Sequence, residues 1–216
     1  MQYKLIIFDL DGTVLDTLDD LTDSVNYALE KNRLPQRKKY EIRNFVGNGI
    51  RLLIERSVPS DCQLKVVDSV FDDFRNHYKH NSCNKTKPYD GIAQLLTELK
   101  SYGIQLAVVS NKADFAVRDI VDRYFNGLFD YYAGEKEGIP RKPAPDSVYN
   151  AMKFFGASDN EVIYIGDSEV DIETAKNAGL DCISVSWGFR DRSVLAENGA
   201  EMVADDVFEL KNLLIK

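Results

Sequence analysis

The sequence contains no apolar run of the roughly 20 residues that a membrane-spanning helix needs. Its amino-terminal segment has a single Lys4 before a short strand-like run and no small-residue cleavage site, so it does not resemble a secretory signal peptide. Cysteine is scarce: Cys62, Cys83 and Cys182 are widely spaced and odd in number. We therefore expect a cytoplasmic protein with reduced thiols rather than a disulfide framework.

Positive charge is also in short supply. The chain has 27 Lys and Arg residues against 35 Asp and Glu residues, a formal net charge of -8. This balance disfavours binding to nucleic acid or to an anionic membrane surface, and we expect neither partner. An acidic protein can still bind an anionic substrate where local cations, a bound metal or backbone N–H groups overcome the overall field.

The two histidines, His77 and His80, lie near Cys83 but lack a fourth ligand, so we expect no zinc site there.

Alternating strand and helix patterns indicate the fold class. Four short apolar runs rich in β-branched residues are typical of buried strands: 4–9, 104–110, 161–167 and 182–187. Amphipathic helical patterns occupy residues 92–103, 113–125, 146–156 and 172–179. This alternation predicts an α/β protein with a Rossmann-like parallel-sheet core that helices cover on both faces.

The interval between the first two strand patterns is different in kind. Residues 18–82 contain helical patterns at 18–32, 49–58 and 64–80 and no convincing strand. We therefore predict two domains. Residues 1–17 and 83–216 form the α/β core domain, and residues 18–82 form an inserted α-helical domain.

Two pairs of carboxylates follow predicted strands. Asp9 and Asp11 end the first strand two residues apart, so their side chains point to the same side of an extended segment. Taken alone, this pair and the following glycine are equally typical of a polar turn. Asp167 and Asp171 follow a second strand. In a parallel sheet both pairs lie at the carboxyl edge, where open α/β sheets bind ligands.

Such a cluster requires positive charge. Two unit charges about 4 Å apart repel by about 4 kcal/mol at an effective dielectric constant of about 20. A cluster with only oxygen ligands favours a hard cation, which predicts Mg²⁺ rather than zinc. Ser110 ends another predicted strand, where its hydroxyl and the following amides can hold an anion, and Lys142 lies between Pro140 and Pro143. Together these groups indicate phosphoryl transfer.

The segments that carry these residues are "DLDGTVLDT", "VVSNK", "RKPAPD" and "IGDSEVDIETAKNAG". In this order they resemble the four motifs of the haloacid-dehalogenase-like phosphatase superfamily. The resemblance implies that Asp9 is the nucleophile and forms an aspartyl-phosphate. It also implies that Asp11 protonates the leaving oxygen and then activates water, and that Ser110 and Lys142 hold the phosphoryl group. An acid at position 11 suits an alkoxide leaving group, which needs a proton, and argues against dehalogenation.

The same resemblance implies the metal ligands. Asp9, the backbone carbonyl of Asp11 and Asp167 are expected to coordinate Mg²⁺. Asp171 is expected to ligate the ion or to support the site from nearby.

The helical insertion resembles the α-helical cap of this superfamily, and its segment "FVGNGIRLLIERSV" looks like the cap of phosphoglycolate phosphatases. The implied substrate is a small phosphorylated metabolite, with 2-phosphoglycolate the expected one. Independently of the resemblance, we expect a monomer or homodimer. Asn48 and Arg56 of the insertion are expected to bind the substrate, together with Thr13 and Asn111 of the core motifs.

Three other functions remain open at this point. A phosphomutase of the β-phosphoglucomutase type shares the machinery, although its motif usually carries an aliphatic residue where this chain has Thr13. A pyrophosphatase would use the same groups. A phospho-acceptor signalling domain also combines carboxylates, a hydroxyl and a lysine, but the helical insertion and Asp11 argue against a long-lived phospho-aspartate.

Overall fold

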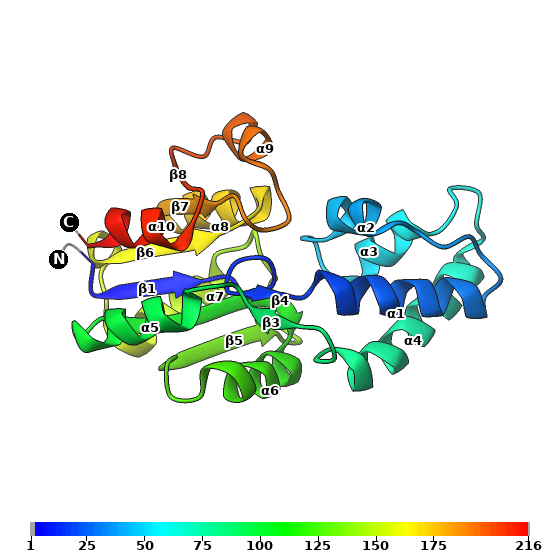
Figure 1. Cartoon of the computed structure of the whole chain (residues 1–216), viewed down its shortest axis with the longest axis horizontal. Coiled ribbons are helices and arrows are strands. Elements are labelled where there is room, and N and C mark those ends of the chain that lie inside the picture. The colour runs from blue at the N-terminus through cyan, green and yellow to red at the C-terminus, as the bar shows by residue number, and fades with distance from the viewer. Residues whose placement is uncertain (1–2, 216) are drawn as a thin grey trace. The chain divides into compact units, whose positions relative to one another are not determined.

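The computed structural model describes residues 3–215, and the chain divides into two units (Figure 1). One unit contains the described residues up to Leu15 and those from Pro88 onward, and the other spans Asp16–Lys87. The chain passes between them at two short paired strands, β2 (Leu15–Asp16) and β3 (Lys87–Pro88). That the helical unit acts as a cap stays a prediction.

A six-stranded sheet forms the centre of the first unit. Its strands are β1 (Leu5–Phe8), β4 (Gln105–Ala113), β5 (Tyr131–Glu135), β6 (Val162–Gly166), β7 (Asp181–Val185) and β8 (Met202–Ala204). They run in the order β5-β4-β1-β6-β7-β8, and each neighbouring pair is parallel. The predicted Rossmann-like α/β core is confirmed.

Two strands and one strand end differ from the sequence-based expectation. The outermost strands, β5 and β8, were not among the four predicted runs. Edge strands bury fewer side chains, and β5 with the sequence YYAGE has only two buried residues, so neither reads as an apolar run. Strand β4 was expected to end at Ser110, but it continues to Ala113 with a register shift after Val109.

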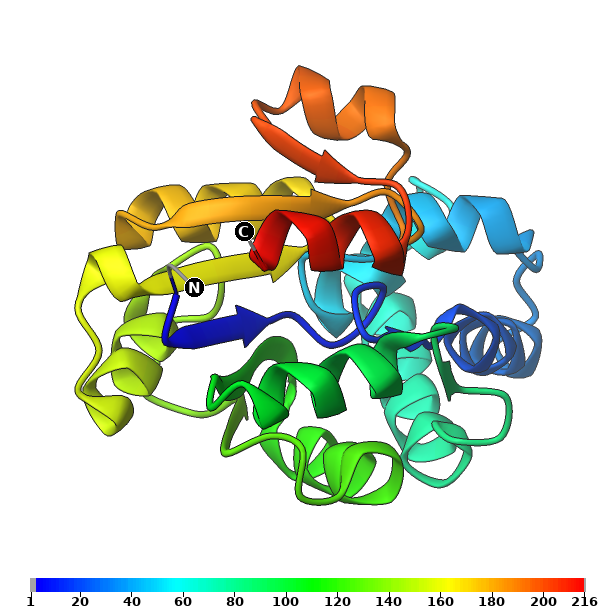
Figure 2. The same ribbon diagram turned by 60° about the vertical axis from the view of Figure 1, so that its left-hand side comes forward.

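Helices cover both faces of this sheet. The helices of this unit are α5 (Ile92–Ser101), α6 (Asp114–Phe125), α7 (Asp146–Phe155), α8 (Glu169–Ala178), α9 (Arg192–Glu197) and α10 (Val207–Leu214). Figure 2 shows α5 and α10 in front of the sheet and α7 and α8 behind it. Leu5 and Ile7 pack in one cluster with residues of α7 and α8, whereas the Phe8 ring meets the Phe129 ring edge-on. Strand β1 is therefore buried on both faces, which explains its unbroken apolar sequence.

The second unit contains four helices: α1 (Leu18–Lys31), α2 (Lys39–Phe45), α3 (Ile50–Ser57) and α4 (Leu64–Asn81). Helix α1 packs mainly against α4, where the buried Phe74 ring stacks on Tyr78. Among the described residues of the whole chain, no helix combines the length and the apolar character that crossing a membrane requires.

Asp20 fastens the end of the second unit to its beginning. Its carboxylate is almost completely buried in the first turn of α1. It accepts hydrogen bonds from the backbone N–H of Lys85, at 3.0 Å to each oxygen, and of Thr86 at 2.8 Å. The segment that leads into β3 is thereby held against the start of α1.

We expect Asp20→Ala to lower the free energy of unfolding by about 2–4 kcal/mol, because it strands buried N–H groups that a charged acceptor now satisfies. Asp23→Ala is the matched control: Asp23 pairs with the Nζ of the same Lys85 at 2.6 Å, but both side chains are about half exposed. The control should lose less than about 1 kcal/mol. Urea denaturation of the full chain measures both. Equal losses would contradict the importance of the Asp20 contacts.

Candidate active site

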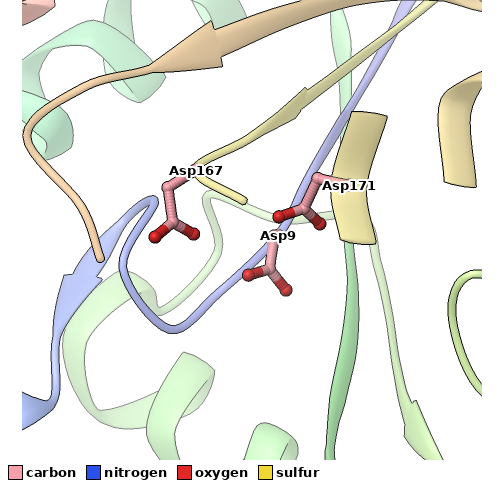
Figure 3. A group of neighbouring side chains, drawn as sticks. All are labelled: Asp9, Asp167 and Asp171. Carbon is pink, nitrogen blue, oxygen red and sulfur yellow. The ribbon is translucent and has the colours of Figure 1, made fainter. Parts of the chain in front are cut away.

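The sheet brings the two acidic motifs to neighbouring strand ends. Phe8 at the end of β1 pairs with Ile165 of β6, and the backbone N–H of Asp9 donates to the Ile165 carbonyl at 2.8 Å. Asp167 directly follows β6, and Asp171 lies in the first turn of α8. Figure 3 shows the three carboxylates as neighbours. One oxygen from each lies within 4.8 Å of the others, and all three side chains are buried.

This crowding affects how the carboxyl groups ionise. Burial raises the pKa of Asp9 to about 7; the charges of Asp171 and Asp11 add to this, while Lys142 opposes it. Burial also raises the pKa of Asp167 well above its usual range, and the charges of Asp171 and Asp9 add to that shift. When ionised, the three carboxylates outnumber the one ammonium group, that of Lys142, which contacts two of them. A hard divalent cation bound by carboxylate oxygens fits this donor set.

Lys142 lies within the carboxylate cluster. Its Nζ donates to Asp9 Oδ1 at 2.7 Å, to Asp171 Oδ1 at 2.8 Å and to the Tyr164 hydroxyl at 2.9 Å. Burial alone would lower the pKa of Lys142, but Asp171 and Asp9 together raise it well above its usual value. The lysine is therefore a charged ammonium group whose three protons point at defined acceptors.

Asp171 is the most fully hydrogen-bonded of the three carboxylates. Its Oδ1 accepts from Lys142 and from the Tyr164 hydroxyl at 3.1 Å. Its Oδ2 accepts from the N–H of Ser168 at 3.1 Å and from the Ser168 hydroxyl at 2.6 Å, completing a capping box at the start of α8. These four contacts use the four lone-pair positions that a carboxylate offers. Asp171 thus orients Lys142 and caps its own helix.

Backbone groups from two other segments lie close against the Asp167 carboxylate. Its oxygens accept from the N–H of Phe189 at 2.6 Å and from the Thr13 hydroxyl at 3.2 Å. Gly12 has a φ of +91°, and a Cβ there would lie 2.3 Å from Asp167 Oδ2; a Cβ at Gly188 would lie 2.4 Å from the Asp167 Cβ. Glycine at both positions leaves room for the carboxylate. Thr13, expected to bind substrate, therefore contacts a predicted metal ligand.

Strand β4 contributes Ser110, Asn111 and Lys112. Ser110 is buried, and its Oγ accepts from the backbone N–H of Lys112 at 3.2 Å. The Asn111 carboxamide forms a reciprocal pair with the backbone of Lys142: Nδ2 donates to its carbonyl at 3.0 Å, and Oδ1 accepts from its N–H at 2.9 Å. Asn111, expected to bind substrate, here fixes the loop that carries Lys142.

Two side chains of this site were missed by the sequence reasoning. The Lys112 Nζ contacts both oxygens of Asp11, at 2.9 and 3.2 Å. Side-chain alternation along the strand places Lys112 on the same side as Ser110, a signal that could have found it. Tyr164 gave a weaker signal, because a tyrosine in the run VIYIG is also ordinary core packing.

The residues expected from the insertion lie in the unit Asp16–Lys87, whereas the carboxylates lie in the other unit. Asn48 is in the loop between α2 and α3. The Arg56 guanidinium donates to the Phe45 carbonyl at 2.9 Å. Arg51, a further cation of this segment, pairs with Glu55 and Asp68. Their roles toward a substrate stay predictions.

Known proteins resemble this chain over nearly its whole length. A phosphoglycolate phosphatase from Mesorhizobium japonicum is 33% identical, with 90% of this chain and 87% of that protein covered. The phosphoglycolate phosphatase of Haemophilus influenzae is 32% identical, with 99% of each covered. The crystal structure of a Lactobacillus delbrueckii protein, whose proposed activity is also phosphoglycolate phosphatase, matches with a TM-score of 0.95, 37% identity and 99% coverage of each chain.

Residues 6–185 match the family profile of the haloacid dehalogenase-like hydrolases, and this span includes all four motifs. The relatives agree with the prediction of a phosphatase. The site geometry, the fold and the sequence profile lead to one assignment: the chain belongs to the haloacid dehalogenase-like hydrolase family.

Proposed function

We propose that the protein is a Mg²⁺-dependent phosphomonoester hydrolase that acts on a small phosphorylated metabolite, with 2-phosphoglycolate as its preferred substrate. The observation that carries this proposal is the cluster of three buried carboxylates, of which Asp9 and Asp171 accept hydrogen bonds from Lys142. The relatives named phosphoglycolate phosphatase support the choice of substrate.

The proposed reaction has two steps. In the first, an Asp9 carboxylate oxygen bonds to phosphorus while the bond to the leaving oxygen breaks. That oxygen keeps the electron pair and receives a proton from Asp11. In the second, water bonds to the phosphorus of the aspartyl-phosphate and gives a proton to Asp11. Inorganic phosphate leaves, and the Asp9 carboxylate is restored together with the protonated Asp11.

The remaining groups serve the phosphoryl group and the metal. Asp9, Asp167 and the Asp11 carbonyl would hold Mg²⁺, which when bound would balance the carboxylate charge and bind phosphate oxygens. Asp171 supports the site through Lys142, because its lone-pair positions are already used. Ser110 and Lys142 would hold the transferring group, which carries charge on its equatorial oxygens.

We propose that substrate choice lies largely in the helical unit acting as a cap. The core residues would bind the phosphoryl group and the metal, and hydrolysis of any phosphate ester would use both. Asn48 and Arg56 would recognise the leaving group, and an arginine can bind a carboxylate such as that of glycolate in a bidentate manner.

The nucleophile is tested by Asp9→Asn. We expect turnover of phosphate esters to fall to background while the far-UV circular dichroism stays that of wild type, because an amide oxygen is a poor nucleophile. Asp181→Asn, at the exposed start of β7, should keep full activity. Mass spectrometry of acid-quenched wild type should detect the phosphorylated Asp9. A substantial residual rate in Asp9→Asn would remove this residue from the role.

The metal is tested by removal and replacement. We expect a chelator to abolish activity, Mg²⁺ to restore it, and Ca²⁺ to fail because its looser coordination does not set an in-line geometry. Titration calorimetry should show Mg²⁺ binding in wild type and much weaker binding in Asp167→Asn. Full activity in the presence of chelator would contradict the proposal.

The substrate is tested with a panel of esters on wild type, Asn48→Ala and Arg56→Ala. We expect the variants to lose 2-phosphoglycolate hydrolysis while they normally hydrolyse small phosphate esters whose leaving group carries no charge. Arg33→Ala is the control, an arginine of the same unit outside the segment that resembles the cap motif. Transfer of phosphate within a sugar phosphate would indicate a mutase, preference for pyrophosphate a pyrophosphatase, and a long-lived phospho-aspartate a signalling domain.

A further inference from the structure

Within the proposed function, on which this inference rests, one buried cation has no assigned role. We propose that Lys112 is a positioning residue for Asp11: it fixes the carboxyl group that exchanges a proton with the leaving oxygen and the attacking water.

The contact is direct and two-sided. The Lys112 Nζ lies 2.9 Å from Asp11 Oδ1 and 3.2 Å from Asp11 Oδ2. The Lys112 side chain is only 4% exposed, whereas that of Asp11 is 17% exposed. Burying an ammonium group without a partner costs free energy, so the Lys112 side chain is held beside Asp11. The more accessible carboxylate depends on the lysine for its orientation.

The backbone of Lys112 is itself held in place. The residue lies inside β4, and its N–H donates to the Ser110 hydroxyl oxygen at 3.2 Å. The neighbouring strand passes so close that a Cβ at Gly134 would lie 2.5 Å from the Lys112 carbonyl oxygen. Asp11 lies between β1 and β2, in a turn that the N–H of Gly12 closes on the Leu15 carbonyl at 2.8 Å. The lysine therefore connects a group in a turn to a strand of the sheet.

The chemistry explains why orientation matters at this carboxyl group. A displacement of about 1 Å from the reacting geometry can cost about 100-fold in rate. Correct placement of Asp11 matters most for a leaving group that cannot depart without a proton.

The inference therefore predicts an effect that depends on the leaving group. The test compares kcat/KM of wild type and Lys112→Met for three substrates: p-nitrophenyl phosphate, ethyl phosphate and 2-phosphoglycolate. The nitrophenolate leaves as a stable anion, whereas the two alkoxides need a proton. Because kcat/KM covers only the steps up to departure of the leaving group, later hydrolysis of the aspartyl-phosphate does not enter the comparison.

We expect Lys112→Met to lower kcat/KM by about 10–100-fold for ethyl phosphate and 2-phosphoglycolate alike, and by less than about threefold for p-nitrophenyl phosphate. Lys112→Arg should restore part of the loss. Lys136→Met should change none of the values, because Lys136 pairs with Asp114 and is about half exposed. Lys112→Gln provides a second test if the methionine variant folds poorly, as judged by circular dichroism.

Two results would overturn the inference. An equal fall for all three substrates would make Lys112 a general structural or electrostatic group, and a fall for 2-phosphoglycolate alone would make it a binding group for the substrate carboxylate. If wild type hydrolyses none of the esters, the proposed function fails and this inference fails with it. Normal wild-type hydrolysis with either overturning pattern leaves the proposed function intact.

Discussion

The site depends on keeping mutually repelling carboxylates together inside the protein. Asp9, Asp167 and Asp171 are buried within reach of one another, and burial raises the pKa of Asp9 to about 7 and that of Asp167 well above normal. Lys142 supplies one positive charge to this group. The three carboxylates outnumber this one ammonium group, and their oxygens suit a hard divalent cation.

Maintaining this cluster requires backbone in close contact with the carboxylates. Gly12 and Gly188 approach Asp167 so closely that a Cβ at either position would overlap it, and Gly166 approaches Asp171 in the same way. The N–H of Phe189 donates to Asp167, and the N–H and hydroxyl of Ser168 donate to Asp171, so these buried carboxylate oxygens have hydrogen-bond partners. The glycine after Asp11 therefore makes room for the carboxylate of a distant motif, beyond its role in the turn.

The features that could be predicted from the sequence are those with a signal in a short, continuous segment. The runs 4–9 and 161–167 identified two central strands and, with them, the edge where Asp9 and Asp167 meet, because a strand buried on both faces has an unmistakably apolar sequence. The edge strand β5 lacks that signal. Contacts between segments far apart in the chain, such as the pairing of Asn111 with the backbone of Lys142, follow from tertiary structure and leave no periodic pattern to read.

Strand β4 gives these distant contacts a common origin. Ser110 and Lys112 are buried in it, and the partly exposed Asn111 lies between them. Lys112 holds Asp11, and Asn111 holds the loop that carries Lys142, which in turn contacts Asp9 and Asp171. Asn111 and Lys112, adjacent in β4, thus set both buried lysines of the site against different carboxylates. These contacts lie in the continuation of β4 past Ser110, where the register with β5 shifts between Val109 and Ala113.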